Sequence, residues 1–332
     1  GFIDFAGSGV IHTLGGIAGL VGAFFLGPRA GRFYPNDDDD ISAAKKYEVR
    51  PLLEHNSVLV TLGGLMLFMG WFPFNASSGS NISQPEDLVF AARGMISTLL
   101  AGSAAGTMVT VYRMWFNPVQ DIQTTINGIL AGLVAVTASC ANIDPWAALV
   151  IGFGAGPVYL FTSYTVLYRF HIDDPLNVFA VHAASGIYGV LMAGVFDLDG
   201  GIVYGKGIDQ FLVQLEGIAV LSAWSLVTAA LAFGTIGRLF GLRASEHDQL
   251  VGLDLLYHRK NAYPESDLTA SRQAQYTRAA KELLHRRNNN RGYLDDSSIH
   301  SGRTSVHSTR AGAGSQRFVV NNANLTAKAI EE

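Results

Sequence analysis

The 332-residue sequence has one cysteine, Cys140, and few charged residues over most of its length. One cysteine excludes an intrachain disulfide framework, and we expect Cys140 to be a small buried side chain rather than a reactive thiol. Of the 23 lysines and arginines, 11 lie in the first 243 residues, in short clusters between long apolar runs. This distribution argues against two soluble domains and predicts an all-α membrane body with a polar C-terminal tail.

The apolar runs predict about seven membrane-spanning helices, because a run of roughly 20 residues matches the ~30 Å of bilayer hydrocarbon that a helix must cross. The runs lie at roughly residues 4–27, 56–75, 88–112, 124–142, 145–168, 176–196 and 211–240. Glycine and alanine recur through them, as in GGIAGLVGA. We interpret most of these small residues as positions where helices pack closely.

Basic residues set the expected orientation. The connections after the first, third, fifth and seventh runs hold most of the arginines and lysines, whereas the alternate connections hold only Lys206. Positive side chains favour the cytoplasmic face, so we expect a multi-pass protein of the plasma membrane with a cytoplasmic C-terminus. Residues 264–332 are rich in Ser, Arg, Asn, Thr and Gly, which predicts a disordered tail near anionic lipid headgroups.

A histidine motif occurs twice. IHTLGGIAGL at residues 11–20 and VHAASGIYGV at residues 181–190 both read aliphatic, His, three small or apolar residues, Gly, Ile, any residue, Gly. In the expected orientation the two motifs cross the membrane in opposite directions, which is typical of an inverted repeat with a site at the repeat interface. At ~1.5 Å per residue, His12 and His182 each lie about 10 Å into their runs.

Two intramembrane histidines at matched places indicate a pathway or a relay, because ionisable groups are costly in a bilayer. The alternative is a pair of polar residues that tie helices together. We predict no metal site, because Asp4 and Glu216 lie near the ends of their runs and no thiolate lies at the same depth. Neutral imidazoles offer one donor and one acceptor, which suits a small solute with a titratable proton. A bare cation would face an idealised desolvation cost on the order of 20 kcal/mol, which ammonium avoids by giving up its proton.

Five stretches carry a family resemblance, in this order along the chain: DFAGSGVIHTLGG (4–16), GWFPFNASSGS (70–80), TTINGILAGLVAVTASC (124–140), DDPLNVFAVHAASGIYG (173–189) and GLRASEHDQLVGLDLLYH (241–258). On these motifs the chain resembles the ammonium transporter family, the Amt/Mep branch of the Amt/Mep/Rh proteins. The resemblance covers most of residues 1–260. It implies the C-terminal part, helices 5 to 11, of an eleven-helix inverted-repeat fold, so we expect a chain truncated at its N-terminus.

The resemblance implies a role for individual pore residues. His12 and His182 look like the twin histidines of the family's hydrophobic pore. Asp4 looks like the buried aspartate that supports ammonium recruitment by shaping the outer site, and Ser78 looks like a hydroxyl of that site. Phe74 looks like one of two stacked phenylalanines that gate the pore.

The resemblance also covers the start of the tail. Arg243, Gly252 and Asp254 lie in a stretch that looks like the family's cytoplasmic tail motif, which packs on the membrane domain or on a neighbouring subunit of a homotrimer. Many relatives have an aspartate where this chain has Asn177. The expected division is a transmembrane domain at 1–243, a tail motif at 244–263 and a disordered tail at 264–332.

The implied function is transport of ammonium or ammonia, with deprotonation at the outer mouth, and not an enzymatic activity. Methylammonium is a further candidate substrate, membrane lipids and sister subunits are the expected partners, and we expect no cofactor and no nucleic acid. The alternative is an ammonium sensor that signals through its tail. A seven-helix receptor is indicated only by the number of runs. An intramembrane hydrolase is disfavoured because no serine has a base at a consistent depth.

Overall fold

The computed structural model describes residues 1–35, 47–52, 54–79, 84–116 and 121–260, and the statements below concern these ranges. They are almost entirely helical, as expected. The helices are η1 (Ser8–Thr13), α1 (Leu14–Leu26), α2 (Ser57–Ala76), α3 (Pro85–Phe116), α4 (Ile122–Val136), α5 (Pro145–Tyr164), η3 (Thr165–Arg169), η4 (Phe179–Ala184), α6 (Ser185–Phe196), η5 (Ile202–Tyr204), α7 (Asp209–Phe240), α8 (Glu246–Val251) and η6 (Asp254–His258). The predicted disordered tail lies outside the described residues.

Six of the predicted runs form helices long and apolar enough to cross a membrane, and the seventh forms the shorter helix α4. A small antiparallel hairpin, which the sequence did not predict, pairs β1 (Phe33–Pro35) with β2 (Tyr47–Val49). The all-α fold class is therefore confirmed for the part of the chain that the structure describes, whereas the eleven-helix inverted repeat stays a prediction. The division at residues 243 and 263 stays a prediction.

Two predicted boundaries are wrong, and one contact explains both. The first helix begins at Ser8 rather than near residue 4, and α4 ends at Val136 rather than near residue 142. The last turns of a helix leave carbonyl groups without intrahelical partners. Beyond α4, the carbonyls of Thr137 and Ala138 accept the N–H groups of Ala6 at 3.1 Å and Phe5 at 2.8 Å. The N-terminal residues therefore stay extended to satisfy these groups.

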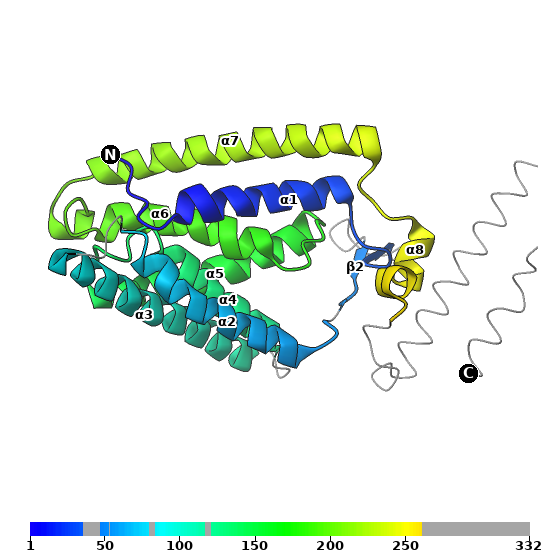
Figure 1. The fold of residues 1–332 in the computed structure, drawn as a ribbon, viewed down its shortest axis with the longest axis horizontal. Coiled ribbons are helices and arrows are strands. Elements are labelled where there is room, and N and C mark those ends of the chain that lie inside the picture. The colour runs from blue at the N-terminus through cyan, green and yellow to red at the C-terminus, as the bar shows by residue number, and fades with distance from the viewer. Residues whose placement is uncertain (36–46, 53, 80–83, 117–120, 261–332) are drawn as a thin grey trace, which may run out of the picture. The chain divides into compact units, whose positions relative to one another are not determined.

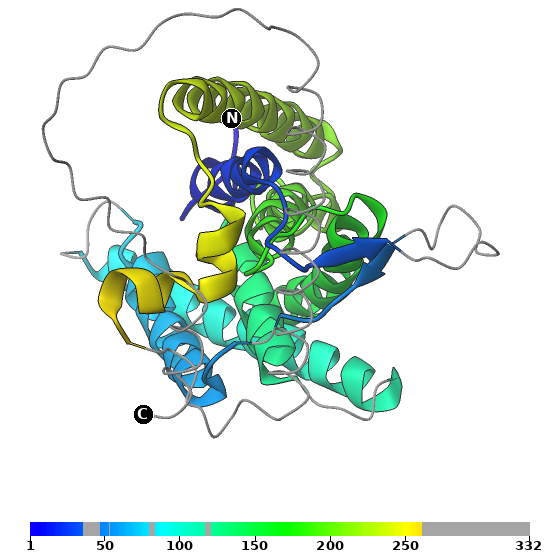
Figure 2. The same ribbon diagram turned by 90° about the vertical axis from the view of Figure 1, so that its right-hand side faces the viewer.

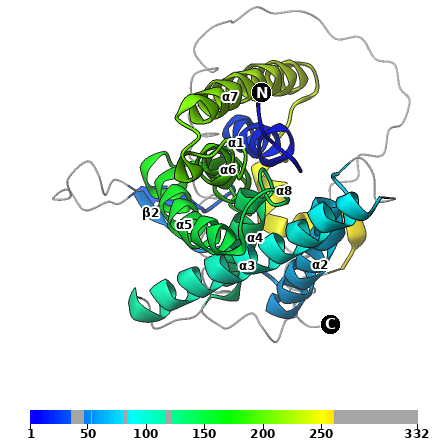
Figure 3. The ribbon, with the colours of Figure 1, turned by 90° about the vertical axis from the view of Figure 1, so that its left-hand side faces the viewer.

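The helices form two groups that meet at α4 and α6. Figures 1 and 3 show α7 beside α1, with α6 next to them, and α2 to α5 grouped below. Ten of the 15 residues of α4 are buried, whereas α2 buries only Trp71 and Asn75. The outward faces of α2 and α7 are apolar and exposed, as the hydrocarbon of a bilayer requires. Both histidine motifs lie near the centre of this packing, on α1 and α6 and the turns before them.

Glycine allows neighbouring helices to approach closely, both between the two groups and within one of them. A Cβ at Gly189 on α6 would overlap the backbone oxygen of Ala135 on α4, and one at Gly152 on α5 would overlap that of Ala101 on α3. Backbone atoms cannot move aside as a flexible side chain can, so the helices themselves would have to separate. These contacts agree with the interpretation of the glycines as packing positions.

We therefore expect Gly189→Ala to lower the thermal midpoint of the purified protein by several degrees, since overpacking a core costs about 1–3 kcal/mol. The matched control is Gly70→Ala in α2, where an added Cβ meets nothing within 4 Å. Alanine is the better helix former, so the control should be neutral or slightly stabilising. Equal midpoints for the two variants in a detergent melting assay would contradict the close approach of α6 to α4.

Candidate functional site

The two predicted histidines come together. His12 lies on η1 and His182 on η4, and their Nδ1 atoms are 3.3 Å apart. The ring centroids are 5.4 Å apart with an angle of 13° between the planes, so the rings are stacked. The side chain of His12 is buried, and that of His182 is half-buried. The structure thus brings together one imidazole from each copy of the histidine motif.

An aspartate caps each histidine helix. The carboxylate of Asp4 accepts the N–H groups of Gly9 at 3.1 Å and Val10 at 2.9 Å, at the start of η1. The carboxylate of Asp174 accepts the N–H group of Phe179 at 2.9 Å, at the start of η4. Asp4 therefore binds the start of the helix that carries His12, and its role in ammonium recruitment stays a prediction.

The two caps lie at matching positions in the two histidine segments. Both DFAGSGVIH and DPLNVFAVH place an aspartate eight residues before the histidine. In both, the carboxylate accepts an N–H group five residues further along the chain. The sequence analysis named Asp4 and missed Asp174 as its counterpart, although this spacing was visible in the sequence.

Both histidines lie on π-helical turns, in which hydrogen bonds join residues five apart. The N–H group of His12 donates to the carbonyl of Gly7 at 3.0 Å. Gly7 has a φ of 97°, a left-handed conformation that glycine adopts without strain. Single π-turns inside α-helices are frequently found at functional sites. The wider turn changes the direction in which each imidazole leaves its helix.

Trp71 on α2 is a site residue that the sequence analysis missed. Its ring stacks on His12 with the centroids 5.0 Å apart and 12° between the planes. Its Nε1–H donates to the hydroxyl of Thr137 at 3.1 Å, which fixes the indole. The ring centroid of Phe74, which was predicted as a gate, lies 5.9 Å from that of His12 and 5.8 Å from that of Trp71. The spacing of three residues between Trp71 and Phe74 places both on one face of a helix and could have revealed the tryptophan.

Ser78, predicted to belong to an external site, lies just beyond the end of α2. Its side chain is exposed, and its hydroxyl donates to the carbonyl of Phe74 at 2.7 Å. The structure therefore places Ser78 one helical turn from Phe74. Among the described residues it shows no contact between Ser78 and either histidine.

The ring nitrogens of the histidine pair limit what the site can do. A hydrogen bond between two Nδ1 atoms needs a proton on one of them and a lone pair on the other. The Nε2 atom of His12 is buried and has no hydrogen-bond partner among the described residues. It is therefore free to accept or donate one hydrogen bond to a small solute. No group of three or more potential metal ligands lies together within the described ranges.

Comparison with known proteins assigns the fold to a family. The model of the Ammonium Transporter Family matches residues 1–263. The chain belongs to this family. Ammonium transporter 3 of Dictyostelium discoideum is 34% identical over 274 residues, which are 79% of this chain and 61% of that protein. Ammonium transporter Amt1 of Haloferax mediterranei is 35% identical over 272 residues, which are 80% of this chain and 50% of that protein.

Solved structures of Amt and Mep proteins have a similar fold. One named "Sensor Amt Protein" aligns with a TM-score of 0.68 at 28% identity, covering 77% of this chain and 60% of its own. Saccharomyces cerevisiae Mep2 aligns with a TM-score of 0.61 at 27% identity, covering 74% of this chain and 56% of its own. The chain thus spans about half to three-fifths of the length of these family members.

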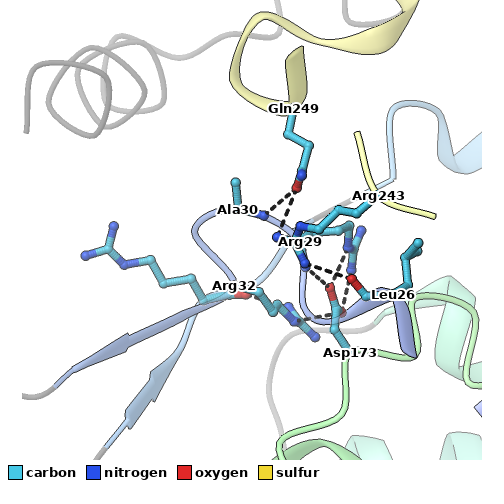
Figure 4. Close-up of polar contacts among 8 residues, drawn as sticks. Leu26, Arg29, Ala30, Arg32, Asp173, Arg243 and Gln249 are labelled. Carbon is cyan, nitrogen blue, oxygen red and sulfur yellow. Dashed lines mark hydrogen bonds and ion pairs between the residues drawn. The ribbon is translucent and has the colours of Figure 1, made fainter. Parts of the chain in front are cut away.

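A second polar cluster lies at the other end of the described helices, where α8 and the hairpin are located (Figure 2). Its centre is the carboxylate of Asp173, whose side chain is 1% exposed. Arg29 binds this carboxylate with both Nε, at 2.8 Å, and a terminal nitrogen, at 2.9 Å. The backbone N–H of Arg29 also donates to Asp173 at 3.0 Å. The Nε of Arg32 lies 3.3 Å from the other carboxylate oxygen of Asp173, Oδ1 (Figure 4).

Of the three predicted tail residues, Arg243 contacts the end of α1, whereas Gly252 and Asp254 make no side-chain contact with this cluster in the described residues. The guanidinium of Arg243 donates to the carbonyl of Leu26 at 3.0 Å. Gly252 ends α8 with a φ of 95°, which turns the chain towards η6. Asp254 is exposed, and its carboxylate makes no hydrogen bond or ion pair within the part of the chain that the structure describes. Gln249, which the sequence analysis missed, accepts the backbone N–H of Ala30 at 3.1 Å.

The charge of Asp173 is maintained at physiological pH. Burial alone would raise the pKa of this carboxyl, but the hydrogen bonds from Arg29 and the charges of Arg29 and Arg32 outweigh it and lower the pKa below its usual value. A lowered folded-state pKa stabilises the fold above the unfolded pKa, about 3.9, and this contribution is lost as the pH falls through the folded pKa.

We therefore expect Asp173→Asn to destabilise the protein by about 1–3 kcal/mol, less than for a fully buried pair because Arg29 is half-exposed. The difference in thermal midpoint from the natural protein should be constant between pH 5 and 8 and shrink below about pH 4. Asp254→Asn, at an exposed carboxylate, is the control and should be neutral. A difference that already shrinks between pH 7 and 5 would contradict the lowered pKa.

Proposed function

We propose that the complete protein transports ammonium across the plasma membrane, and that His12 and His182 line the path. The observation that carries this proposal is the 3.3 Å contact between the two Nδ1 atoms inside an apolar helical core. Membership of the ammonium transporter family supports a transporter rather than an enzyme. Relatives named as ammonium transporters support ammonium as the substrate, with methylammonium as a further candidate.

The chemistry of the pair suits ammonia and a proton that travel separately. Ammonium gives up a proton at the outer mouth, because the desolvation of a cation in a bilayer is too costly. Ammonia, which is small and neutral, then passes the apolar walls beside Phe74 and Trp71. Asp4 acts by holding η1, and Ser78 offers a hydroxyl at the mouth. Ammonia recovers a proton on the other side.

The histidine pair provides the route for the proton. A proton that arrives at Nε2 of one ring allows that ring to pass its Nδ1 proton to Nδ1 of the other. The second ring then releases its own Nε2 proton towards the far side. One proton enters, one leaves, and each ring exchanges one tautomer for the other. Replacement of either ring removes one of the two nitrogens that the transfer needs.

The basic clusters support a cytoplasmic C-terminus. We also propose that the protein assembles as a homotrimer in a lipid bilayer and that Arg243, Gly252 and Asp254 belong to a tail segment that couples conformation to transport. An ammonium sensor that signals through this tail remains the alternative. No feature of the residues described here favours signalling over transport, and flux separates the two.

The decisive experiment measures ammonium-evoked current and labelled methylammonium uptake in cells that express the complete protein. Replacing both histidines, His12→Ala with His182→Ala, should abolish the current or its selectivity over potassium, because the proton route is lost. The control is His55→Ala, at an exposed histidine before α2 and outside the tail segment, which should transport normally.

Single replacements should each reduce the current by about tenfold or more, since general acid–base groups typically contribute 10²–10⁴-fold. Normal current and normal selectivity in a well-expressed double variant would show that the histidines do not carry the proton. The absence of both current and uptake in the natural protein would instead favour the sensor.

A further inference from the structure

A buried glutamine on α7 lies beside the chain that precedes Asp4. Helix α7 has 32 residues, and the buried ones are Gln214, Ile218, Ser225 and Ala229. The glutamine is the largest polar side chain of this set, and it is 0% exposed. A buried amide is costly unless its donors and acceptors have partners. The partners of Gln214 therefore indicate why a glutamine lies at this place in a membrane-spanning helix.

The amide of Gln214 makes four hydrogen bonds. Its oxygen accepts the backbone N–H of Ile3 at 2.7 Å, and its NH₂ group donates to the carbonyl of Ile3 at 2.6 Å. The NH₂ group also donates to the carbonyl of Val190 on α6 at 3.0 Å, and the oxygen accepts the side-chain amide of Gln210 at 3.0 Å. Two donor hydrogens and two acceptor lone pairs are all that a side-chain amide offers. Half of this capacity is used on the backbone of one residue, Ile3.

A second contact places the same part of α7 against the N-terminal segment. Gly217 lies three residues after Gln214 and therefore on the same face of the helix. A Cβ at Gly217 would overlap the ring of Phe2. The ring also packs in an apolar cluster that includes Ile218 and Val190. Figures 1 and 3 show the N-terminus beside the start of α7. Helix α7 thus binds residues 2 and 3 through a ring on a glycine and through an amide.

Asp4 lies between two anchored residues. On one side of it, both backbone groups of Ile3 are bound by Gln214. On the other side, the N–H of Phe5 donates to the carbonyl of Ala138 at 2.8 Å. The backbone on either side of Asp4 is therefore fixed, first to α7 and then to the segment that follows α4. Because one residue separates the two anchors, a shift of Ile3 would move the carboxylate of Asp4.

We propose that Gln214 is a positioning residue that fixes Asp4 at the start of η1, and through Asp4 the segment that carries His12. The carboxylate of Asp4 accepts the N–H groups of Gly9 and Val10, so its displacement would release the first turn of η1. This proposal rests on the proposed function, in which Asp4 acts by holding η1.

The alternative is that Gln214 only joins α7 to the other helices, as polar side chains in membrane helices often do. The bond to Val190 would be enough for that role, and the pair of bonds to Ile3 would not be needed. Ser225 is an example of the simpler case. Its hydroxyl donates to the carbonyl of Leu14 at 2.7 Å and so joins α7 to α1. Ser225 therefore provides a matched control on the same helix.

The test measures hydrogen–deuterium exchange of single backbone amides, which does not depend on transport. The complete protein is studied in lipid nanodiscs. Gln214→Met keeps the length of the side chain and removes the amide, whereas Ser225→Ala removes the hydroxyl that binds α1. The amide of Ile3 reports on the bond to Gln214, and the amides of Gly9 and Val10 report on the position of the Asp4 carboxylate.

We expect Gln214→Met to speed exchange of all three amides about threefold or more, because local opening becomes easier when the anchor is lost. Ser225→Ala should leave the three rates unchanged. Faster exchange at Ile3 alone would overturn the proposal, because Asp4 would then hold Gly9 and Val10 without help from α7.

A second variant covers the case in which Gln214→Met does not fold. Gly217→Ala adds one methyl group that displaces the ring of Phe2 and leaves the amide of Gln214 in place. It should speed exchange at Gly9 and Val10 in the same direction. Unchanged rates at these two amides in a folded Gly217→Ala protein would contradict the proposal.

Uptake of labelled methylammonium into proteoliposomes separates this proposal from the proposed function. Gln214→Met should raise the half-saturating outside concentration about threefold or more and change the maximal rate less, whereas Ser225→Ala should change neither. Faster exchange at Gly9 and Val10 without any uptake by the natural protein would retain the positioning role and reject transport. Normal uptake by Gln214→Met with unchanged exchange at these amides would retain transport and reject the positioning role.

Discussion

The described structure depends on how two imidazoles inside an apolar helical core satisfy their ring nitrogens. A buried ring nitrogen without a partner carries a desolvation penalty, so a lone histidine at this depth would be unfavourable. His12 and His182 solve the problem for their Nδ1 atoms by facing each other at 3.3 Å. This contact depends on the packing of η1 against η4 and α6, and of η4 against α1. The capping aspartates and the π-turns fix the two segments that carry the rings.

Small residues make the contact possible. The rings can meet only if the helices that carry them approach closely, and the structure achieves this with glycine against backbone. Gly16 on α1 lies against the backbone of Ala183, next to His182, and Gly186 on α6 lies against that of Ser8 at the start of η1. In each copy of the histidine motif, the glycine four residues after the histidine packs against the segment that carries the other histidine. The glycines thus allow the close approach that the contact between the two rings needs.

The helices and the histidine pair could be predicted from the sequence, because apolar runs and repeated motifs are visible along the chain. The membrane runs, the antiparallel histidine motif and the family resemblance rest on patterns that local sequence carries. The π-turns at both histidines could not be predicted, because they depend on an aspartate several residues away and on tertiary packing. The end of α4 at Val136 was missed because the carbonyls beyond it are taken by Phe5 and Ala6, a contact between distant segments.

The cluster around Asp173 was missed for a related reason. Arg29 looked like one of several basic residues in a loop, and nothing in the sequence indicates that it binds a carboxylate 144 residues away. Trp71 could have been predicted as a site residue, because it lies three residues before Phe74 and therefore on the same face of a helix. Contacts between distant segments are where reasoning from one sequence ends, and in this chain they connect the tail to the histidine helices.

The proposed proton transfer needs the two rings to share one proton through their Nδ1 atoms. Solid-state ¹⁵N NMR of histidine-labelled protein in lipid bilayers, with His12→Ala used for assignment, measures where this proton lies. One of the two rings should be protonated at Nδ1 and the other at Nε2, with a measurable coupling between the two Nδ1 nuclei. Two rings that are both protonated only at Nε2, without that coupling, would contradict it.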